Sequence, residues 1–480
     1  MADTKPLSIG SKAAYGFGSV AFGVKNGGFD YFLLLFYSQV IGLDPRLVGI
    51  AITVALVADA LSDPIVGYWS DNLRSRWGRR HPFMYASALP VALSYFLLWN
   101  PPAGWSQTGL FWYLLLLAIL VRTFITFYET PSAALVPELT EDYVERSSLV
   151  GYRSYFGWTG GNAVTVLMFF FMFPVMATET IADGRFNRGS YELMGVIASV
   201  LIFTSIMVSA LGTHSRIRHL KQPPPARRIT TLTVFREIFE TMANRSFMAL
   251  FVAALLGSLA TGLAAALSFY FYTYFWEFTS IETGLITMGV FIAAVIGFVL
   301  APSVTRRVGK RRGAMVIGLI AFVGAPLPIV LRLVDVLPEN GTPFVFWFVF
   351  IAGVIDLGLI ICFQILYTSM MADLVEHSEL ATGRRSEGVI FAAITFIRKA
   401  VQGFGLMFAS FVLHWAKFPA GAGVGQVSDD AVWRLGAYYV PTILAIWLLM
   451  MAVISLYRLD RAAHEKNLRE LAARHLDAGE

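Results

Sequence analysis

Cysteine is almost missing from this chain of 480 residues, in which Cys362 is the single example. One cysteine excludes an intrachain disulfide, and its apolar neighbours indicate a packing residue rather than a metal ligand. The sequence also lacks a glycine-rich loop followed by lysine, so nothing supports ATP-driven chemistry. Neither a Ser–His–Asp grouping nor a set of metal ligands stands out, since most of the seven histidines fall in loops or tails. We therefore expect no enzyme activity and no cofactor.

Charged residues are scarce as well, at 14% of the chain, whereas a soluble protein carries about a quarter. Hydrophobic residues make up 56%, and the mean hydropathy is +0.63. Apolar runs of about 20 residues recur along the chain, and each can cross a hydrocarbon core of about 30 Å. These features predict an all-α membrane protein with twelve transmembrane helices. The predicted spans are 12–41, 47–71, 83–100, 109–136, 150–176, 193–212, 246–275, 283–304, 313–334, 343–372, 387–416 and 432–457.

The net charge of +5 would suit nucleic acid, but the placement of the basic residues indicates a membrane. They gather in loops that follow the second, sixth, eighth, tenth and twelfth spans, whereas the loop at 100–109 carries no charge. Basic residues concentrate in this way on the cytoplasmic side of membrane proteins. We predict a multi-pass protein of the plasma (cell inner) membrane with both termini cytoplasmic. Its surroundings are then the lipid bilayer, and no nucleic acid is expected as a partner.

One long polar stretch divides the chain. Residues 213–245 contain three consecutive prolines and several basic residues, which is typical of a solvated linker. The basic segment at 71–80, after the second span, is echoed at 305–313, after the eighth. Such repetition between halves is typical of duplicated transporters. We predict an N-terminal six-helix bundle at 1–212, a cytoplasmic linker at 213–245, a C-terminal six-helix bundle at 246–457 and a helical cytoplasmic tail at 458–480.

Two acidic residues interrupt the predicted second span. Asp59 and Asp63 are four residues apart, which is about one helical turn, so both carboxylates face the same way. A carboxylate in the middle of a bilayer costs several kcal/mol unless it meets a cation, a partner or a water-filled cavity. The pair therefore predicts either a cation or proton site in a transporter, or a static ion pair that holds two helices together.

Four segments resemble one transporter family. They are AYGFGS at 14–19, the block at 59–83 that begins DALSDPIVGYWSDN, the block at 129–153 that begins ETPSAALVPELT, and MMADLVEHSE at 370–379. Together they are similar to the glycoside–pentoside–hexuronide:cation symporters, the melibiose permease family of the major facilitator superfamily. The resemblance covers the whole chain. It implies two six-helix bundles around a central cavity, alternating access by rocking of one half against the other, and cation-coupled symport.

The same resemblance implies a cation site formed by Asp59, Ser62, Asp63 and Thr126. Carboxylates and hydroxyls supply the oxygen ligands that a hard monovalent cation prefers. Asp59 and Asp63 would be the metal ligands if coupling is to sodium, and protonation of either one could replace the metal. The family also carries a lysine where Lys399 lies, about 18 Å into its span. Lys399 is expected to pair with the aspartates when the cation is absent, or to form a permanent bridge.

For the substrate, the resemblance implies that Glu129 holds sugar hydroxyls. Arg122 lies two turns earlier on nearly the same helix face. Arg153 matches an arginine of many relatives, and either binds substrate or pairs with an acid of the 137–148 loop. The acids available there are Glu138, Glu141 and Asp142.

Two departures from the melibiose permease pattern put galactoside binding in doubt. Gly23 stands where that type has a second sugar-binding carboxylate, for which a shifted alignment offers Asn26, and Ala133 replaces a stacking tryptophan. The intramembrane cations would suit an anionic substrate, such as a hexuronide or a sulfonated sugar. The aromatic run at 269–278 either lines a pocket or marks the membrane interface. Asp30 and Asp356 are further intramembrane acids without an assigned role; the cations are Lys25, Arg122, Arg153 and Lys399.

We therefore predict a secondary active transporter that couples a monovalent cation, Na+ or H+, to the uptake of a small sugar-like solute such as a glycoside, pentoside or hexuronide. We expect it to be monomeric. A cation-coupled symporter of lysophospholipids or other amphiphiles is the alternative. A metal-dependent membrane enzyme that uses Asp59 and Asp63 on lipid diphosphates is a third hypothesis, and a scaffold or receptor without transport is a fourth.

Overall fold

The structure is a computed structural model that describes residues 7–140, 143–217, 245–382, 401, 403–423 and 425–457. Ten helices in these ranges are long and apolar enough to cross a membrane. An eleventh predicted span is represented by the apolar helix Gly403–Trp415. The prediction of an all-α protein with twelve spans is confirmed. The spanning helices are α4 (Pro45–Asn72), α5 (His81–Leu98), α6 (Gln107–Leu139), α7 (Tyr143–Leu167), α9 (Arg188–His214), α11 (Arg245–Tyr270), α12 (Ser280–Val308), α13 (Lys310–Gly324) with α14 (Leu327–Leu333), α15 (Pro343–Thr382) and α17 (Asp429–Ser455).

The first span is broken rather than continuous. It consists of α1 (Ile9–Phe17), α2 (Ser19–Gly27), a π-helical turn η1 (Gly28–Phe32), α3 (Leu33–Leu35) and a second π-helical turn η2 (Phe36–Val40). The break between α1 and α2 falls at Gly18, where an added Cβ would lie 1.7 Å from the hydroxyl oxygen of Tyr128. A glycine is therefore required for the close approach of this span to α6.

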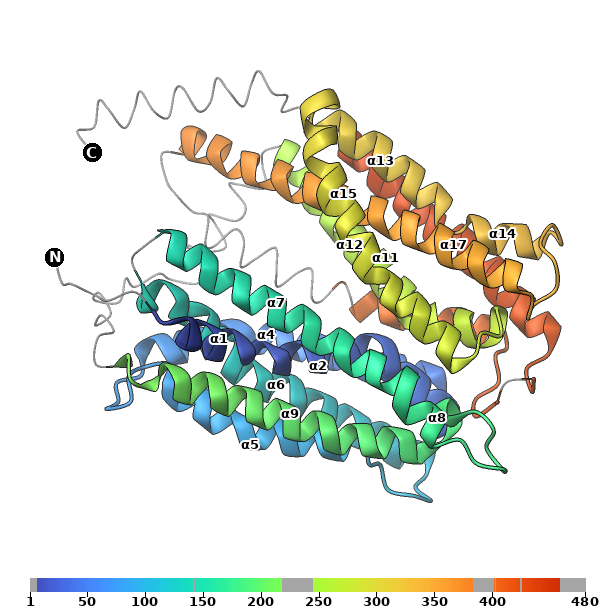
Figure 1. Cartoon of the computed structure of the whole chain (residues 1–480), viewed down its shortest axis with the longest axis horizontal. Helices are drawn as coiled ribbons and strands as arrows, with labels where there is room; N and C mark the ends of the chain where they lie inside the picture. Colours follow the sequence, from blue (N-terminus) through green and yellow to red (C-terminus); the bar gives the residue numbers. More distant parts are fainter. Residues whose placement is uncertain are drawn as a thin grey trace.

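The helices form two groups, α1–α9 and α11–α17, which lie one above the other in Figure 1. Most close packing is within a group, as between α4 and α6, α5 and α9, or α12 and α15. One end of the molecule carries two arginine-rich segments, the loop at 73–80 and the turn from α12 into α13 at 306–312, and we call it the basic end; the opposite end is the far end. The groups approach each other toward the far end and diverge toward the basic end (Figure 1). The predicted domain boundaries stay predictions, because 218–244 lies outside the described residues.

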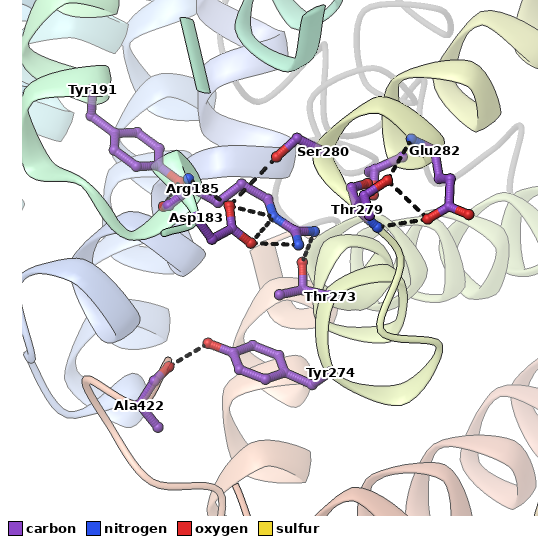
Figure 2. A network of polar contacts seen from close by, with 10 residues as sticks. Asp183, Arg185, Tyr191, Thr273, Tyr274, Thr279, Ser280, Glu282 and Ala422 are labelled. Carbon is purple, nitrogen blue, oxygen red and sulfur yellow. Dashed lines mark hydrogen bonds and ion pairs between the residues drawn. The ribbon is translucent and has the colours of Figure 1, made fainter. Parts of the chain in front are cut away.

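Polar contacts join the two groups at the far end (Figure 2). A loop of the first group contains η4 (Gly184–Phe186), where Arg185 pairs with Asp183 at 2.6 Å. Arg185 also donates to the hydroxyl of Thr273, at 3.0 Å, in the π-helical turn η6 (Phe271–Phe275) of the second group. Ser280 at the start of α12 donates to Asp183 at 3.4 Å. The loop after the fifth span thus ties both groups together.

A second set of contacts closes the far end beside the first span. The hydroxyl of Tyr270 on α11 is hydrogen-bonded to the Ser38 hydroxyl, and Gln39 donates to the same oxygen at 3.5 Å. The backbone N–H groups of Gly421 and Ala422 donate to Ser38 and Gln39 at 3.0 and 3.2 Å. These bonds hold the turn at the end of the first span against the second group.

Candidate cation and substrate site

The predicted cation residues lie where α4 packs against α6. Asp59 and Asp63 project from α4 toward Arg122 and Thr126, which are one turn apart on α6. Asp59 is 1% exposed, Arg122 3% and Thr126 0%. The structure thus brings together two residues that are 63 positions apart in the sequence and places their charges in contact inside the first group.

The hydroxyl of Thr126 is shared by both carboxylates. Its oxygen lies 2.9 Å from Oδ1 of Asp59, 3.0 Å from Oδ1 of Asp63 and 3.1 Å from the backbone oxygen of Arg122. A threonine hydroxyl carries one hydrogen and can donate it to only one of these three acceptors at a time. Both carboxylates therefore meet at one shared hydroxyl, and such a cluster of oxygen atoms is chemically suited to a proton or a monovalent cation.

Arg122 lies in a different place from the one expected. The sequence put it beside Glu129 on the substrate side, but its Nη1 lies 3.2 Å from Oδ2 of Asp59. Its guanidinium also stacks 4.6 Å over the ring of Phe29, and its Nε is buried without a hydrogen-bond partner among the described residues. The physical reason is that Asp59 and Arg122 face each other across the α4–α6 contact, where an unpaired charge would be costly. Lys399, the cation expected there, lies outside the described residues.

Ser62 turns away from the carboxylates. Its hydroxyl donates to the backbone oxygen of Asp59 at 2.9 Å, as small hydroxyl residues often do within a helix. Its role as a cation ligand therefore stays a prediction.

A second polar group surrounds Arg153 on α7. Arg153 donates to the Tyr15 hydroxyl at 3.2 Å, and that hydroxyl donates to the backbone oxygen of Ser132 at 2.7 Å. The positive charge of Arg153 also attracts the carboxylate of Glu129 on α6. Glu129 of the fourth span and Arg153 of the fifth, both inferred to bind substrate, therefore lie close enough to interact.

Of the loop acids considered as partners of Arg153, Glu138 is engaged elsewhere. Arg79 and Arg80 both contact one oxygen of Glu138, at 2.7 and 3.1 Å. Arg80 donates in addition to the Ser70 hydroxyl at 2.8 Å. The basic segment after the second span therefore fixes the basic end of α6. Glu141 and Asp142 lie outside the described residues.

Glu145 fixes the start of the chain at the same end. Lys12 lies 2.9 Å from its carboxylate, and the N–H of Leu7 donates to it at 2.8 Å. Burial alone would raise the pKa of Glu145, but hydrogen bonds from Thr140, Lys12 and Leu7 outweigh it, and the pKa is lowered. The carboxylate therefore stays ionised at neutral pH and ties α1 to α7.

The glycine at position 23 is explained by packing. A Cβ added to Gly23 would lie 1.8 Å from the backbone oxygen of Gly157, so α2 and α7 touch backbone to backbone there. No carboxylate side chain fits at this position. Asn26 lies one turn further along and is half-buried, and its role in substrate binding stays a prediction.

A cavity of about 360 Å³ lies in the second group and extends to the first. This volume falls in the range of about 300–1,000 Å³ that is usual for small-molecule sites. The aromatic run at 269–278 contributes Phe269, Phe271, Tyr272 and Trp276 to its wall, which favours the pocket interpretation of that run over the membrane-interface one. Sequence reasoning missed the polar residues of the first group that reach this cavity, because nothing in their local sequence marks them; they are Tyr31, Asn162 and Thr165.

Two six-helix groups, with buried charges inside the first and a cavity lined by residues of both, define a membrane transporter of the major facilitator fold. The sequence model of the MFS/sugar transport protein family matches residues 14–461, and the chain belongs to this family. It is 24% identical to the inner membrane symporter YicJ of Escherichia coli, over 86% of this chain and 84% of YicJ. It is 25% identical to the sodium-dependent lysophosphatidylcholine symporter 1 of Gallus gallus, over 97% of this chain and 89% of the relative. The solved nucleoside transporter NupG shares the fold, with a TM-score of 0.58 and 13% identity over 92% of this chain and 98% of NupG.

Proposed function

We propose that the protein couples the movement of a monovalent cation to the symport of a sugar-like solute. The observation that carries this proposal is the shared hydroxyl of Thr126, which lies within 3.0 Å of both Asp59 and Asp63. Two carboxylates that meet at one hydroxyl repel each other, and a proton or a cation between them would relieve that repulsion. The family description and the similarity to symporters support the same coupling and the same class of solute.

In the proposed cycle, Arg122 is the internal substitute for the coupling cation. It neutralises Asp59 while the site is empty, at 3.2 Å. An arriving Na+ or H+ takes over this neutralisation, and the guanidinium moves toward Phe29 and Asp30 on the first span. Asp30 already lies close enough to Arg122 and Lys25 to interact electrostatically with both. Cation binding on α4 is thereby transmitted to the span that borders the cavity.

The solute would bind between the groups, from Glu129 and Arg153 on one side to the aromatic cavity on the other. The basic end is the cytoplasmic side by the distribution of arginine and lysine. Because the groups are joined at the far end, the arrangement corresponds to a state that faces the cytoplasm. Rocking of the groups would break the far-end contacts and close the basic end.

A lysophospholipid symporter is the second candidate. The large aromatic wall of the cavity favours it, since an acyl chain would pack against these rings. The similarity to the lysophosphatidylcholine symporter points the same way. A membrane enzyme acting on diphosphates has less support, because the matched family and the similar proteins are transporters.

The test is uptake by the purified full chain in lipid vesicles under an imposed Na+ or H+ gradient. Labelled sugars that are neutral or acidic are compared with labelled lysophosphatidylcholine. Gradient-driven accumulation of a sugar is the expected result. Accumulation of lysophosphatidylcholine alone would reject the sugar proposal, and turnover of a lipid diphosphate with magnesium would reject transport.

A further inference from the structure

The cavity contains a carboxylate that the cycle above does not use. Asp356 lies thirteen residues after Pro343, where α15 begins, which places it about 20 Å along the helix and near the middle of the membrane. It is half-buried and lines the cavity. Among the described residues of the cavity wall, it carries the only formal charge.

The surroundings of Asp356 leave one side of it free for a ligand. It makes no hydrogen bond and no ion pair with the residues that the structure describes. On one side Asp356 faces Gly324, where an added Cβ would already lie 3.4 Å from a carboxylate oxygen. The glycine therefore presents no side chain to this carboxylate. An ionised group at this depth is costly unless something compensates it. The cavity beside it is where a compensating ligand would lie.

The rest of the wall fits a hydroxylated ring. Aromatic side chains of the second group, including Tyr272, Tyr439 and Trp447, form broad apolar surfaces. The first group adds polar atoms: Asn162 uses its amide N–H₂ on the Trp158 backbone, at 2.9 Å, which leaves its amide oxygen available to a ligand. Apolar walls with a few polar atoms that fix orientation are the usual composition of a small-molecule site.

The charge of the wall bears on the class of substrate. A uronate or sulfonate would place its negative charge beside the Asp356 carboxyl group, and like charges repel strongly away from water once that group is ionised. Two of the four cations that suggested an anionic substrate are engaged elsewhere, Arg122 with Asp59 and Arg153 with Tyr15 and Glu129. Neutral hydroxyl groups, in contrast, donate well to a carboxylate.

We propose that Asp356 is a substrate-contacting residue that accepts hydrogen bonds from hydroxyl groups of a neutral sugar ring held between the two helix groups. This inference rests on the proposed symport of a sugar-like solute and replaces the expectation of an acidic sugar. The ring packs against the aromatic wall of the second group, and Asn162 contacts it from the first. Because both groups touch the ring, its binding favours their approach.

The experiment compares Asp356→Asn and Asp356→Glu with Asp335→Asn, an exposed loop carboxylate of the same helix group. Uptake of labelled xylose, methyl glucoside and lactose is measured in vesicles, with glucuronate and galacturonate as competitors. A hydrogen bond to a charged group contributes about 1.5–3 kcal/mol, so Asp356→Asn should raise KM for the neutral sugar roughly 10-fold or more. Half-saturation by the cation and the unfolding temperature should stay unchanged, Asp356→Glu should recover part of the affinity, and Asp335→Asn should match the wild type.

The proposal is overturned by an unchanged KM in a folded Asp356→Asn, or by stronger competition from the uronates than from neutral sugars. Recovery of Asp356→Asn by Lys399→Gln would also overturn it, because that result identifies a structural ion pair. If Asp356→Asn does not reach the membrane, a second experiment takes the place of this variant. In it, Asp356 of the wild type is labelled with a hydrophobic carbodiimide. The proposal is supported if the transported neutral sugar protects Asp356 from labelling. It is rejected if the sugar leaves the extent of labelling unchanged. Failure of the coupling proposal gives a different result: uptake no longer depends on the ion gradient, but the sugar still protects Asp356 from labelling.

Discussion

Arg122 and Asp59 form a buried ion pair between α4 and α6, with 3.2 Å between Nη1 and Oδ2. Sequence reasoning left two hypotheses for the acidic pair, a coupling site or a static bridge, and this contact is compatible with both. They differ in what happens when the pair is removed. Loss of one partner from a buried ion pair typically costs about 3–5 kcal/mol, whereas loss of both can be nearly neutral.

A double-mutant cycle on this pair therefore separates the hypotheses. Arg122→Gln alone should lower the unfolding temperature and abolish uptake, because the buried Asp59 carboxylate loses its guanidinium partner. Combination with Asp59→Asn should restore most of the unfolding temperature but not gradient-driven uptake, since the coupling carboxylate is gone. Thermal unfolding in detergent and uptake in vesicles are the two measurements. Recovery of both properties in the double variant would identify a static bridge.

Asp63 is the member of the site that can be neutralised with least damage to folding. It is half-buried, and the Thr126 hydroxyl can donate to Asp59 instead. Asp63→Asn should abolish concentrative uptake and leave exchange of solute across the vesicle membrane. The control is Asp44→Asn at the start of α4, because asparagine caps a helix as well as aspartate does. Normal accumulation by Asp63→Asn would remove this residue from the coupling site.

Glu129 should affect the solute rather than the cation. Its carboxylate interacts electrostatically with Arg153, whereas the Thr126 hydroxyl bridges Asp59 and Asp63. Glu129→Gln should weaken solute binding about 10-fold, as expected for loss of a charged hydrogen-bond acceptor. Cation binding measured without solute, by calorimetry or by thermal shift, should stay within twofold. A matching loss of cation affinity would show that Glu129 belongs to the cation site instead.

The contact of Tyr270 with Ser38 and Gln39 should bias the molecule toward the state that is closed at the far end. Tyr270→Phe removes hydrogen bonds worth about 1 kcal/mol and should shift the populations roughly fivefold toward opening there. Tyr274→Phe is a matched control on the same segment, since its hydroxyl bonds Ala422 within the second helix group at 2.8 Å. Accessibility of a reporter cysteine at the far end measures the shift. Equal accessibility in both variants would contradict the gating role of Tyr270.

Local sequence patterns were sufficient to predict the membrane spans and part of the candidate site. Hydropathy predicted the spans, because lipid contact demands about 20 apolar residues whatever the neighbours are. The four-residue spacing of Asp59 and Asp63 predicted their shared face, and the resemblance supplied Thr126, which contacts both. The pairing of Arg122 with Asp59 was not predictable in the same way, since it depends on how α4 is rotated against α6. A central cavity was expected, but most of its wall was not predictable, because Tyr31, Asn162 and Asp356 come from three distant spans and meet only in the assembled fold.

Packing explains the glycine at position 23, where the melibiose permease pattern has a sugar-binding carboxylate. An added Cβ would lie 1.8 Å from the Gly157 backbone oxygen, so Gly23→Ala must push α2 from α7. Overpacking of this kind costs about 1–3 kcal/mol. Gly151→Ala on α7 is the matched control, because no atom lies within 4 Å of its added Cβ, and alanine favours a helix over glycine by about 1 kcal/mol. The unfolding temperature should therefore fall for Gly23→Ala and hold or rise for Gly151→Ala.

Gly23→Asp should unfold at a still lower temperature, without gaining sugar affinity. A stable Gly23→Asp with tighter sugar binding would show that this position belongs to the substrate site after all.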